Sequence, residues 1–384
     1  MTDRNSDPDR ALGPEWDALE LLCTGRADEL PEALAGVLGR PDLSWGELIE
    51  QALRHQMLAL LSFHVLALSD EHGLRVPGRV ANHLAEVLDL NRWRLQVFRH
   101  EAARVADALR DLGVPFVGTK GITFESTIYG GQGTRTLKDI DFMIAPDARE
   151  AVSAALERLG YQPGDYDQAT GTIVPLARRQ ELIYALNPDH LPRHARLATE
   201  PGVRYLYVDF ANSLTWSKSR YEVPVDEALR HTVDLPLAGV PSGTLPSFRP
   251  DFQFLFTVLH LFREAWHEQW LELEVDVSLM KFGDVIRLFS AHRAELGQGR
   301  LADLLDGFGV AEPVAWVLEH TDRTFGTAMV AELGLDGRVD ESWLGQAGPS
   351  YGQDRRWEGT MRARLWAKDR QRLFRVSDPA PTQS

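Results

Sequence analysis

Two aspartates alternate with apolar residues in the run Lys138-Asp139-Ile140-Asp141-Phe142-Met143-Ile144, and this run constrains the fold more than any other feature of the chain. The apolar residues predict a strand over residues 139–145, on which Asp139 and Asp141 project from one face about 6.5–7 Å apart. Because two carboxylates cannot share a dry core, we expect them at a wet edge of a sheet, paired with cations. A pair of Mg²⁺ ions fits such a site, with Mn²⁺ as a second candidate.

A site of this kind needs a third carboxylate from a neighbouring strand, and Asp209 is the candidate. It stands near the end of the run VRYLYVDF (203–210), whose β-branched and aromatic residues predict a strand. We therefore assign Asp139, Asp141 and Asp209 as metal ligands and as catalytic residues. The chain has a second Asp-x-Asp pair, Asp165-Tyr166-Asp167, which lacks apolar flanks and is predicted to be a solvated turn.

A glycine-rich turn precedes the aspartates. Gly118-Thr119-Lys120-Gly121 follows a short predicted strand (114–117) and leads into a predicted helix (122–129). Such a turn presents backbone N–H groups to a phosphate, and the Lys120 ammonium adds a positive charge. Arg135 could clamp a phosphate or pair with an acidic neighbour. We assign Gly118, Thr119, Lys120, Gly121 and Arg135 to nucleotide binding; the alternative is a plain tight turn with a surface lysine.

The spacing of apolar residues changes along the chain and divides it into segments. Helical spacing predominates from about residue 43 to residue 112 and returns from residue 247 to about residue 333, with the predicted strands between them. The predicted segments are a partly disordered tail (1–30), a helical region (31–113), a catalytic core (114–245), a helical domain (246–345) and a basic C-terminal segment with its tail (346–384). We expect an α+β protein whose chemistry lies in the middle.

The formal net charge is −15, which argues against general nucleic-acid binding unless basic residues are segregated. One segment does segregate them: residues 355–375 contain eight basic and two acidic side chains. This segment could dock on an anionic partner or a membrane surface. The favoured interpretation is that it packs its apolar residues Trp357, Met361 and Leu365 on the chain's own acidic body.

Targeting signals are weak in this sequence. The N-terminal run MTDRNSDPDR is polar and charged, and the longest apolar stretch, residues 57–68, is shorter than the ~20 residues that span a bilayer. A single cysteine, Cys23, excludes a disulfide framework. We expect a cytoplasmic protein without a transmembrane segment, and the sequence leaves its oligomeric state open.

The motifs around the aspartates resemble the uncharacterised bacterial nucleotidyltransferase family of the DNA polymerase β superfamily. That family carries a Leu-Lys-Gly turn, a tyrosine, an arginine and an Asp-x-Asp strand, and the matching residues here are Lys120-Gly121, Tyr129, Arg135 and Asp139-Ile140-Asp141. The resemblance extends upstream to Ser44-Trp45 and Arg54-His55, and downstream to residues 252–289, at His260 and Asp284. Thr119 replaces the family's leucine, and Asp209-Phe210-Ala211-Asn212 replaces its acidic-Leu-His-Trp sequence.

The resemblance implies a polymerase β-like core, a small mixed sheet with helices, embedded between N- and C-terminal helical regions. It also implies transfer of a nucleoside monophosphate from an NTP, by default ATP, to a small-molecule or peptide acceptor, with release of pyrophosphate. Two other functions stay open: a catalytically degenerate partner protein in a biosynthetic or defence system, and another phosphoryl-transfer enzyme such as a kinase.

The acceptor is expected to contact the segment from Gly164 to Gly202, which lies between the second and third predicted strands. His190 and His194 fall within it and could line an acceptor pocket. A polar loop is the favoured interpretation of these two histidines.

Overall fold

The structure is a computed structural model of the 384-residue chain. It describes residues 13–25, 30–186, 189–216, 219–273, 275–297, 299–350 and 353–376. Most of the predicted N-terminal tail and residues 377–384 lie outside this range, and helix α1 (Pro14–Thr24) forms within the segment predicted as tail. The chain forms two compact units, residues 57–256 and residues 1–56 with 257–384.

The unit of residues 57–256 contains the predicted core together with two long helices before it. Its helices are α4 (Leu58–His72), α5 (Gly78–Asp111), α6 (Gly121–Thr127), the 3₁₀ turn η1 (Pro146–Ala148), α7 (Arg149–Arg158), α8 (Arg178–Leu186), α9 (Val225–Ala228) and the start of α10 (Pro250–Trp266). Its strands are β1 (Phe116–Thr119), β2 (Ile140–Ile144), β3 (Gln162–Asp167), β4 (Thr172–Pro175), β5 (His194–Leu197), β6 (Tyr205–Ala211), β7 (Thr232–Pro236) and β8 (Thr244–Phe248).

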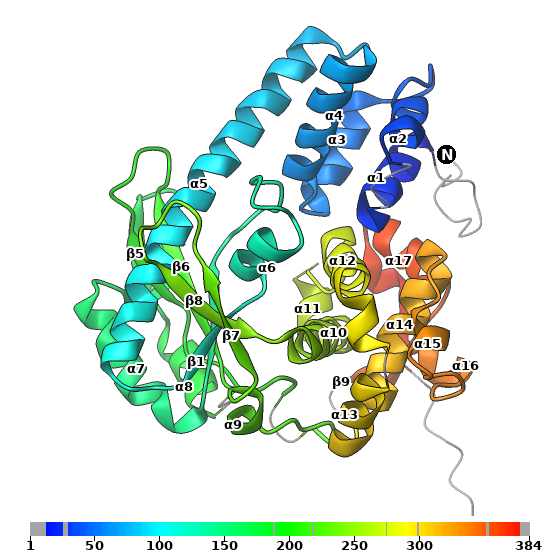
Figure 1. The fold of residues 1–384 in the computed structure, drawn as a ribbon. Coiled ribbons are helices and arrows are strands. Elements are labelled where there is room, and N and C mark those ends of the chain that lie inside the picture. The colour runs from blue at the N-terminus through cyan, green and yellow to red at the C-terminus, as the bar shows by residue number, and fades with distance from the viewer. Residues whose placement is uncertain are drawn as a thin grey trace, which may run out of the picture. The chain divides into compact units, whose positions relative to one another are not determined.

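These strands form one mixed sheet of eight described strands, in the order β4-β3-β5-β6-β2-β1-β8-β7. The pairs β2/β6 and β1/β8 are parallel, and the other neighbours are antiparallel. Helix α5 lies across one face of the sheet (Figure 1), where residues such as Phe98 and Val105 join the core formed by the inward residues of β2 and β6. The mixed sheet with flanking helices confirms the predicted α+β fold class.

Of the eight strands of this sheet, only β1, β2 and β6 were predicted, and β3 is one of those that were not expected. Asp165-Tyr166-Asp167, predicted as a solvated turn, forms the end of β3, so this prediction is wrong. The backbone of β3 pairs with β4 and β5. The Tyr166 ring also packs on Tyr205 of β6, at a centroid distance of 4.5 Å. The strand is therefore stabilised by contacts with residues that are distant in the sequence. The polar, glycine-containing sequence of β3 has no local pattern that predicts a strand.

The second unit is mainly helical. Its elements are α1, α2 (Leu30–Leu38), α3 (Trp45–Arg54), the rest of α10, α11 (Glu268–Glu272), α12 (Leu279–Leu296), α13 (Arg300–Phe308), α14 (Ala311–Phe325), α15 (Met329–Glu332), α16 (Glu341–Leu344), α17 (Met361–Trp366), the 3₁₀ turn η2 (Arg370–Leu373), and a three-stranded sheet of β9 (Gln346–Ser350), β10 (Gln353–Trp357) and β11 (Phe374–Val376). None of the described helices is both long and apolar enough to cross a membrane.

The basic C-terminal segment packs on its own chain, as the favoured interpretation predicted. Trp357, Met361 and Leu365 are buried. Arg364 donates to Asp276 Oδ2 at 3.0 Å and Arg370 donates to Asp276 Oδ1 at 2.5 Å. All three charged side chains are fully buried, so breaking this network would leave an uncompensated charge in the interior.

Candidate functional site

Two of the predicted carboxylates lie opposite each other in the sheet. Strands β2 and β6 are parallel neighbours, and Asp141 is the Cα partner of Asp209. The following residues, Phe142 and Phe210, stack with ring centroids 5.0 Å apart inside the core. Because successive side chains of a strand point to opposite faces, Asp141 and Asp209 share the face away from that core.

Asp139 immediately precedes β2, two residues before Asp141. Burial, together with the negative charges of Asp141 and Asp209, raises the pKa of Asp139 to about 7 against the opposing charge of Lys120. Because Asp141 is the strand partner of Asp209 and Asp139 stands two residues before Asp141, the three predicted carboxylates occupy neighbouring positions of the sheet. We call Asp139, Asp141 and Asp209 the carboxylate cluster.

Asp209 has cationic and imidazole neighbours. His190 Nδ1 lies 3.6 Å from Asp209 Oδ1. Burial alone would raise the pKa of Asp209, but the adjacent His190 and the charges of Lys120 and Arg193 hold it below the usual range. The pKa of Tyr184 on α8 is raised by burial and by the charge of Asp209. The cluster is therefore flanked by residues of the segment predicted to meet the acceptor.

The two histidines of that segment differ, and the polar-loop interpretation is wrong for His194. His190 forms an isolated bridge with Ala211 at the end of β6, which brings it to Asp209. His194 belongs to β5 and is completely buried, with Nδ1 2.7 Å from Pro192 O.

Lys120 reaches the cluster from the turn after β1. Its Nζ lies 3.1 Å from Asp141 Oδ1. Its backbone φ is +49°, a region that residues other than glycine occupy only at a cost, commonly where surrounding structure or function requires it. The preceding residue, Thr119, is the Cα partner of Asp141, so the register of β1 and β2 brings Lys120 to this carboxylate.

The predicted turn at residues 118–121 is wrong in extent, since Gly118 and Thr119 belong to β1 and Gly121 begins α6. Both glycines lie against neighbouring side chains. A Cβ at Gly118 would lie 2.4 Å from Leu245 Cδ2, and a Cβ at Gly121 would lie 2.7 Å from an Arg135 guanidinium nitrogen. Side chains at these positions would therefore displace Leu245 or Arg135. The glycine pattern thus has a structural cause that is independent of any bound phosphate.

Arg135 is positioned by a residue that sequence reasoning missed. Its guanidinium lies 5.3 Å from the Phe124 ring centroid. Glu125, completely buried on α6, accepts backbone N–H bonds from Gly133 at 2.6 Å, Thr134 at 3.3 Å and Arg135 at 2.8 Å. The available signal was a lone glutamate in the otherwise uncharged run ITFESTIY.

The residues that depart from the family pattern at the end of β6 have structural contacts. Asn212 Nδ2 donates to Ile144 O at 3.1 Å, and its backbone N–H donates to Asp189 O at 2.7 Å. Ala211 is buried beside the isolated bridge to His190. Asn212 therefore ties together the ends of β2 and β6 and the segment that carries His190.

The donor set of the cluster consists of carboxylate oxygens, which Mg²⁺ and Mn²⁺ prefer. Within the described ranges, no three His, Cys, Asp or Glu side chains already stand close enough together to hold a metal ion. Lys120 Nζ instead contacts one oxygen of Asp141. The residues fit a hard divalent cation in chemistry, and their side chains would have to rotate towards it.

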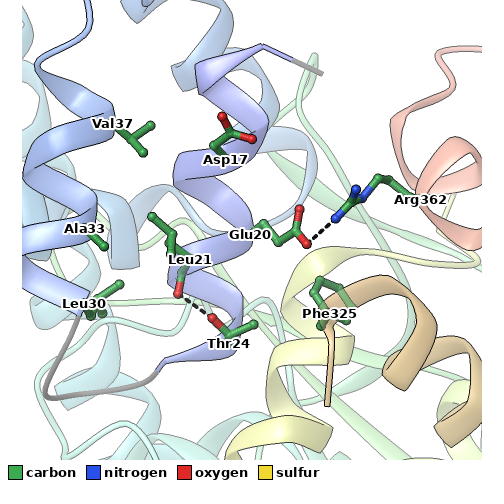
Figure 2. Close-up of a pocket in the computed structure, with 9 residues that line it drawn as sticks. All are labelled: Asp17, Glu20, Leu21, Thr24, Leu30, Ala33, Val37, Phe325 and Arg362. Atoms are coloured by element: carbon green, nitrogen blue, oxygen red, sulfur yellow. Dashed lines mark hydrogen bonds and ion pairs between the residues drawn. The ribbon is translucent and has the colours of Figure 1, made fainter. Parts of the chain in front are cut away.

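A separate hollow of about 570 Å³ lies in the unit of residues 1–56 and 257–384 (Figure 2). Its lining residues are Asp17, Glu20, Leu21, Thr24, Leu30, Ala33, Val37, Phe325 and Arg362. Glu20 pairs with Arg362 at its edge, and the remaining surface is largely apolar. None of the predicted site residues lines this hollow.

Comparison with known proteins identifies the family. The uncharacterised nucleotidyltransferase family matches residues 41–326, a range that includes every predicted site residue from Gly118 to Asp209. No curated protein matches the chain. Since the match covers well over half of the 384 residues, the chain belongs to the uncharacterised nucleotidyltransferase family.

Proposed function

We propose that this protein transfers a nucleoside monophosphate from an NTP, by default ATP, to a hydroxyl, amine or phosphate group of an acceptor and releases pyrophosphate. The observation that carries the proposal is the carboxylate cluster on one sheet face, with the Lys120 ammonium 3.1 Å from Asp141. Clustered carboxylates next to a lysine in a strained turn are costly to a fold, and such features are typical of functional sites.

Asp139, Asp141 and Asp209 are the residues that would hold Mg²⁺ or Mn²⁺. Their oxygens suit a hard divalent cation, and their mutual repulsion favours one. When bound, a pair of such ions supplies charge stabilisation for the attacking and leaving oxygens of an in-line displacement.

The chain's own residues supply binding and proton transfer. Lys120 and Arg135, with the backbone of residues 118–121, neutralise and position the triphosphate. Asp209, oriented by His190, accepts a hydrogen bond from the acceptor group and receives its proton. The acceptor atom bonds to the α-phosphorus, the bond to the bridging oxygen breaks, and the electron pair leaves with pyrophosphate.

Binding of each NTP with Mg²⁺, measured by titration calorimetry, tests the nucleotide half of the proposal. Saturable, Mg²⁺-dependent binding that is lost in Asp139→Asn/Asp141→Asn is the expected result. If no NTP binds, the degenerate partner protein is the better description of the chain.

The reaction itself is tested by product mass. Incubation with the NTP, Mg²⁺ and cell extract should yield acceptors that gain a nucleotidyl mass, together with pyrophosphate. A gain of one phosphate with release of NDP would instead identify a kinase.

A further inference from the structure

Three tyrosines lie on the sheet face that carries the carboxylate cluster. Tyr205 and Tyr207 alternate along β6 with the core residues Leu206 and Val208, so they share a face with Asp209. Tyr205 lies between the other two rings, 4.5 Å from Tyr166 of β3 and 4.7 Å from Tyr207. We call Tyr166, Tyr205 and Tyr207 the tyrosine strip.

A small side chain on the intervening strand allows these rings to meet. Strand β5 separates β3 from β6 in the sheet. Its Ala195 is the Cα partner of Tyr207 and therefore occupies the same face with a single methyl group. The small side chain leaves room for Tyr166 to reach across β5, and Tyr207 Oη accepts a hydrogen bond from the Tyr166 backbone N–H at 2.8 Å.

Arg193 connects the tyrosine strip to the carboxylate cluster. Its guanidinium lies 5.0 Å from the Tyr207 ring centroid and 3.8 Å from Asp165. The charges of Asp209 and Asp139 also act on it and raise its pKa against the lowering effect of burial. Along β6, Tyr207 is about 7 Å from Asp209 and Tyr205 is about 13 Å from it.

The tyrosine strip and Lys120, the residue proposed to bind the triphosphate, lie on opposite sides of the carboxylate cluster. Lys120 follows β1, which borders β2 on the side opposite to β6. A triphosphate held by Lys120 therefore approaches Asp141 from β1. The tyrosine strip extends away from Asp209 on the β6 side, where the acceptor must enter.

The strip is also open to solvent. Its three tyrosines are half-buried, and Leu197, the Cα partner of Tyr205, is 47% exposed. Aromatic rings that served only the core would be covered, as Phe142 and Phe210 are on the opposite face. These half-buried rings, with interplanar angles of 28° between Tyr166 and Tyr205 and 52° between Tyr205 and Tyr207, offer a planar ligand offset-stacked and edge contacts.

We propose that the tyrosine strip binds the acceptor, and that this acceptor is a small molecule with a planar aromatic ring about 7–13 Å from the atom that is nucleotidylated. The proposal rests on the nucleotidyl-transfer function proposed above. A small molecule fits better than a nucleic acid because the chain has a net charge of −15 and the acidic cluster adjoins the strip.

Ligand-observed saturation-transfer NMR with phenol and with cyclohexanol tests the proposal without knowledge of the natural acceptor. Phenol should bind more strongly than cyclohexanol, which has a similar size but no π-system. Tyr205→Leu should weaken phenol binding about five- to tenfold, the effect of losing one aromatic contact, and Tyr205→Phe should retain it. Trp93→Leu, which removes an exposed aromatic side chain on α5, is the matched control and should bind phenol like the wild type.

Equal binding of phenol and cyclohexanol, or unchanged phenol binding in Tyr205→Leu, would overturn the proposal. Tyr166→Leu repeats the test if Tyr205→Leu does not fold. Loss of the phenol signal on saturation with Mg·ATP would also overturn it, because the strip would then hold the base of the nucleotide. Displacement of phenol by a hexa-adenylate RNA would also overturn it, because the acceptor bound at the strip would then be a nucleic acid.

The two proposals fail separately. Asp139→Asn/Asp141→Asn should lose Mg·ATP binding and keep phenol binding, whereas Tyr205→Leu should show the reverse. A wild-type protein that binds phenol at the strip and no NTP would refute nucleotidyl transfer. A protein that binds Mg·ATP and shows no Tyr205-dependent phenol binding would refute the acceptor strip alone.

Discussion

Asp141 of β2 and Asp209 of β6 are direct partners in a parallel pair of strands, and the next residue on each strand, Phe142 and Phe210, stacks within the core. The aromatic pair fixes the register that brings the carboxylates to one face. A slip of one residue would turn a carboxylate into the core, which makes the aspartate arrangement as well specified as the core itself.

Glu125 is predicted to hold the loop that carries Arg135. Glu125→Gln replaces one acceptor oxygen by an amide NH₂ group, so either the bond from Arg135 N–H to Oε2 or the bonds from Gly133 and Thr134 N–H to Oε1 are lost. Because the lost hydrogen bonds involve a buried charge, we expect a loss of about 2–3 kcal/mol in unfolding free energy and weaker Mg·ATP binding. Denaturant unfolding and calorimetry measure the two effects.

Glu157→Gln is the matched control for this change, since Glu157 is exposed on α7. It should alter stability by less than about 0.5 kcal/mol. Equal stability and equal Mg·ATP binding in the two variants would show that Glu125 does not position the loop.

Lys120 combines a charge with a strained backbone, and two substitutions separate these properties. Lys120→Met removes the ammonium that faces Asp141, so the apo protein should melt earlier and bind Mg·ATP more weakly. Lys120→Gly loses the same charge but relieves a positive φ that costs about 1–3 kcal/mol, so it should melt above Lys120→Met. Differential scanning calorimetry gives the order.

Ser242 provides the control for backbone strain, because it is exposed and its φ is +55°. Ser242→Gly should raise the melting temperature without changing Mg·ATP binding. If Lys120→Met binds Mg·ATP as the wild type does, Lys120 has no role at the triphosphate.

Two buried histidines predict acid sensitivity of the unit formed by residues 1–56 and 257–384. Burial, with nearby arginine charges, lowers the pKa of both His55 and His320 to about 3. Between pH 6.5 and pH 3 the unfolded chain therefore binds protons that the folded chain does not. The contribution of the two neutral histidines to the free energy of unfolding is complete above about pH 6.5. Below that pH it falls by about 1.4 kcal/mol per histidine for each pH unit.

The melting temperature measured at about pH 7 and about pH 5 tests this dependence. His320→Gln should lower stability at the higher pH but reduce the difference between the two pH values. A difference as large as that of the wild type would mean that His320 does not contribute to the acid sensitivity.

The aspartate pair and the third carboxylate could be predicted because they depend on local patterns. Ile140, Phe142 and Ile144 alternate with the aspartates, and the β-branched and aromatic run of β6 identifies the strand that carries Asp209. The adjacency of β2 and β6 was expected from their order among the three predicted strands, although β3, β4 and β5 lie between them in the chain.

The remaining features depend on contacts between distant residues. The partners of Glu125 are backbone N–H groups, which no side-chain pattern reveals. The contact of Tyr166 with Tyr205 depends on the strand order β3-β5-β6, and Gly118 is required by Leu245 on β8. The composition correctly indicated a strand followed by a helix here, but the predicted turn at residues 118–121 is shorter: Gly118 and Thr119 belong to β1 and Gly121 begins α6.

The most direct test of nucleotidyl transfer by this cluster is the melting temperature of Asp139→Asn/Asp141→Asn with and without Mg·ATP, beside the wild type and the exposed control Asp147→Asn. We predict that Mg·ATP at about 100 times its Kd stabilises the wild type and the control by about 2.7 kcal/mol and leaves the double variant unchanged. Without ligand, the double variant should melt at the wild-type temperature or above, because the clustered carboxylates repel one another. An earlier-melting double variant that Mg·ATP still stabilises would contradict the account and make the aspartates structural.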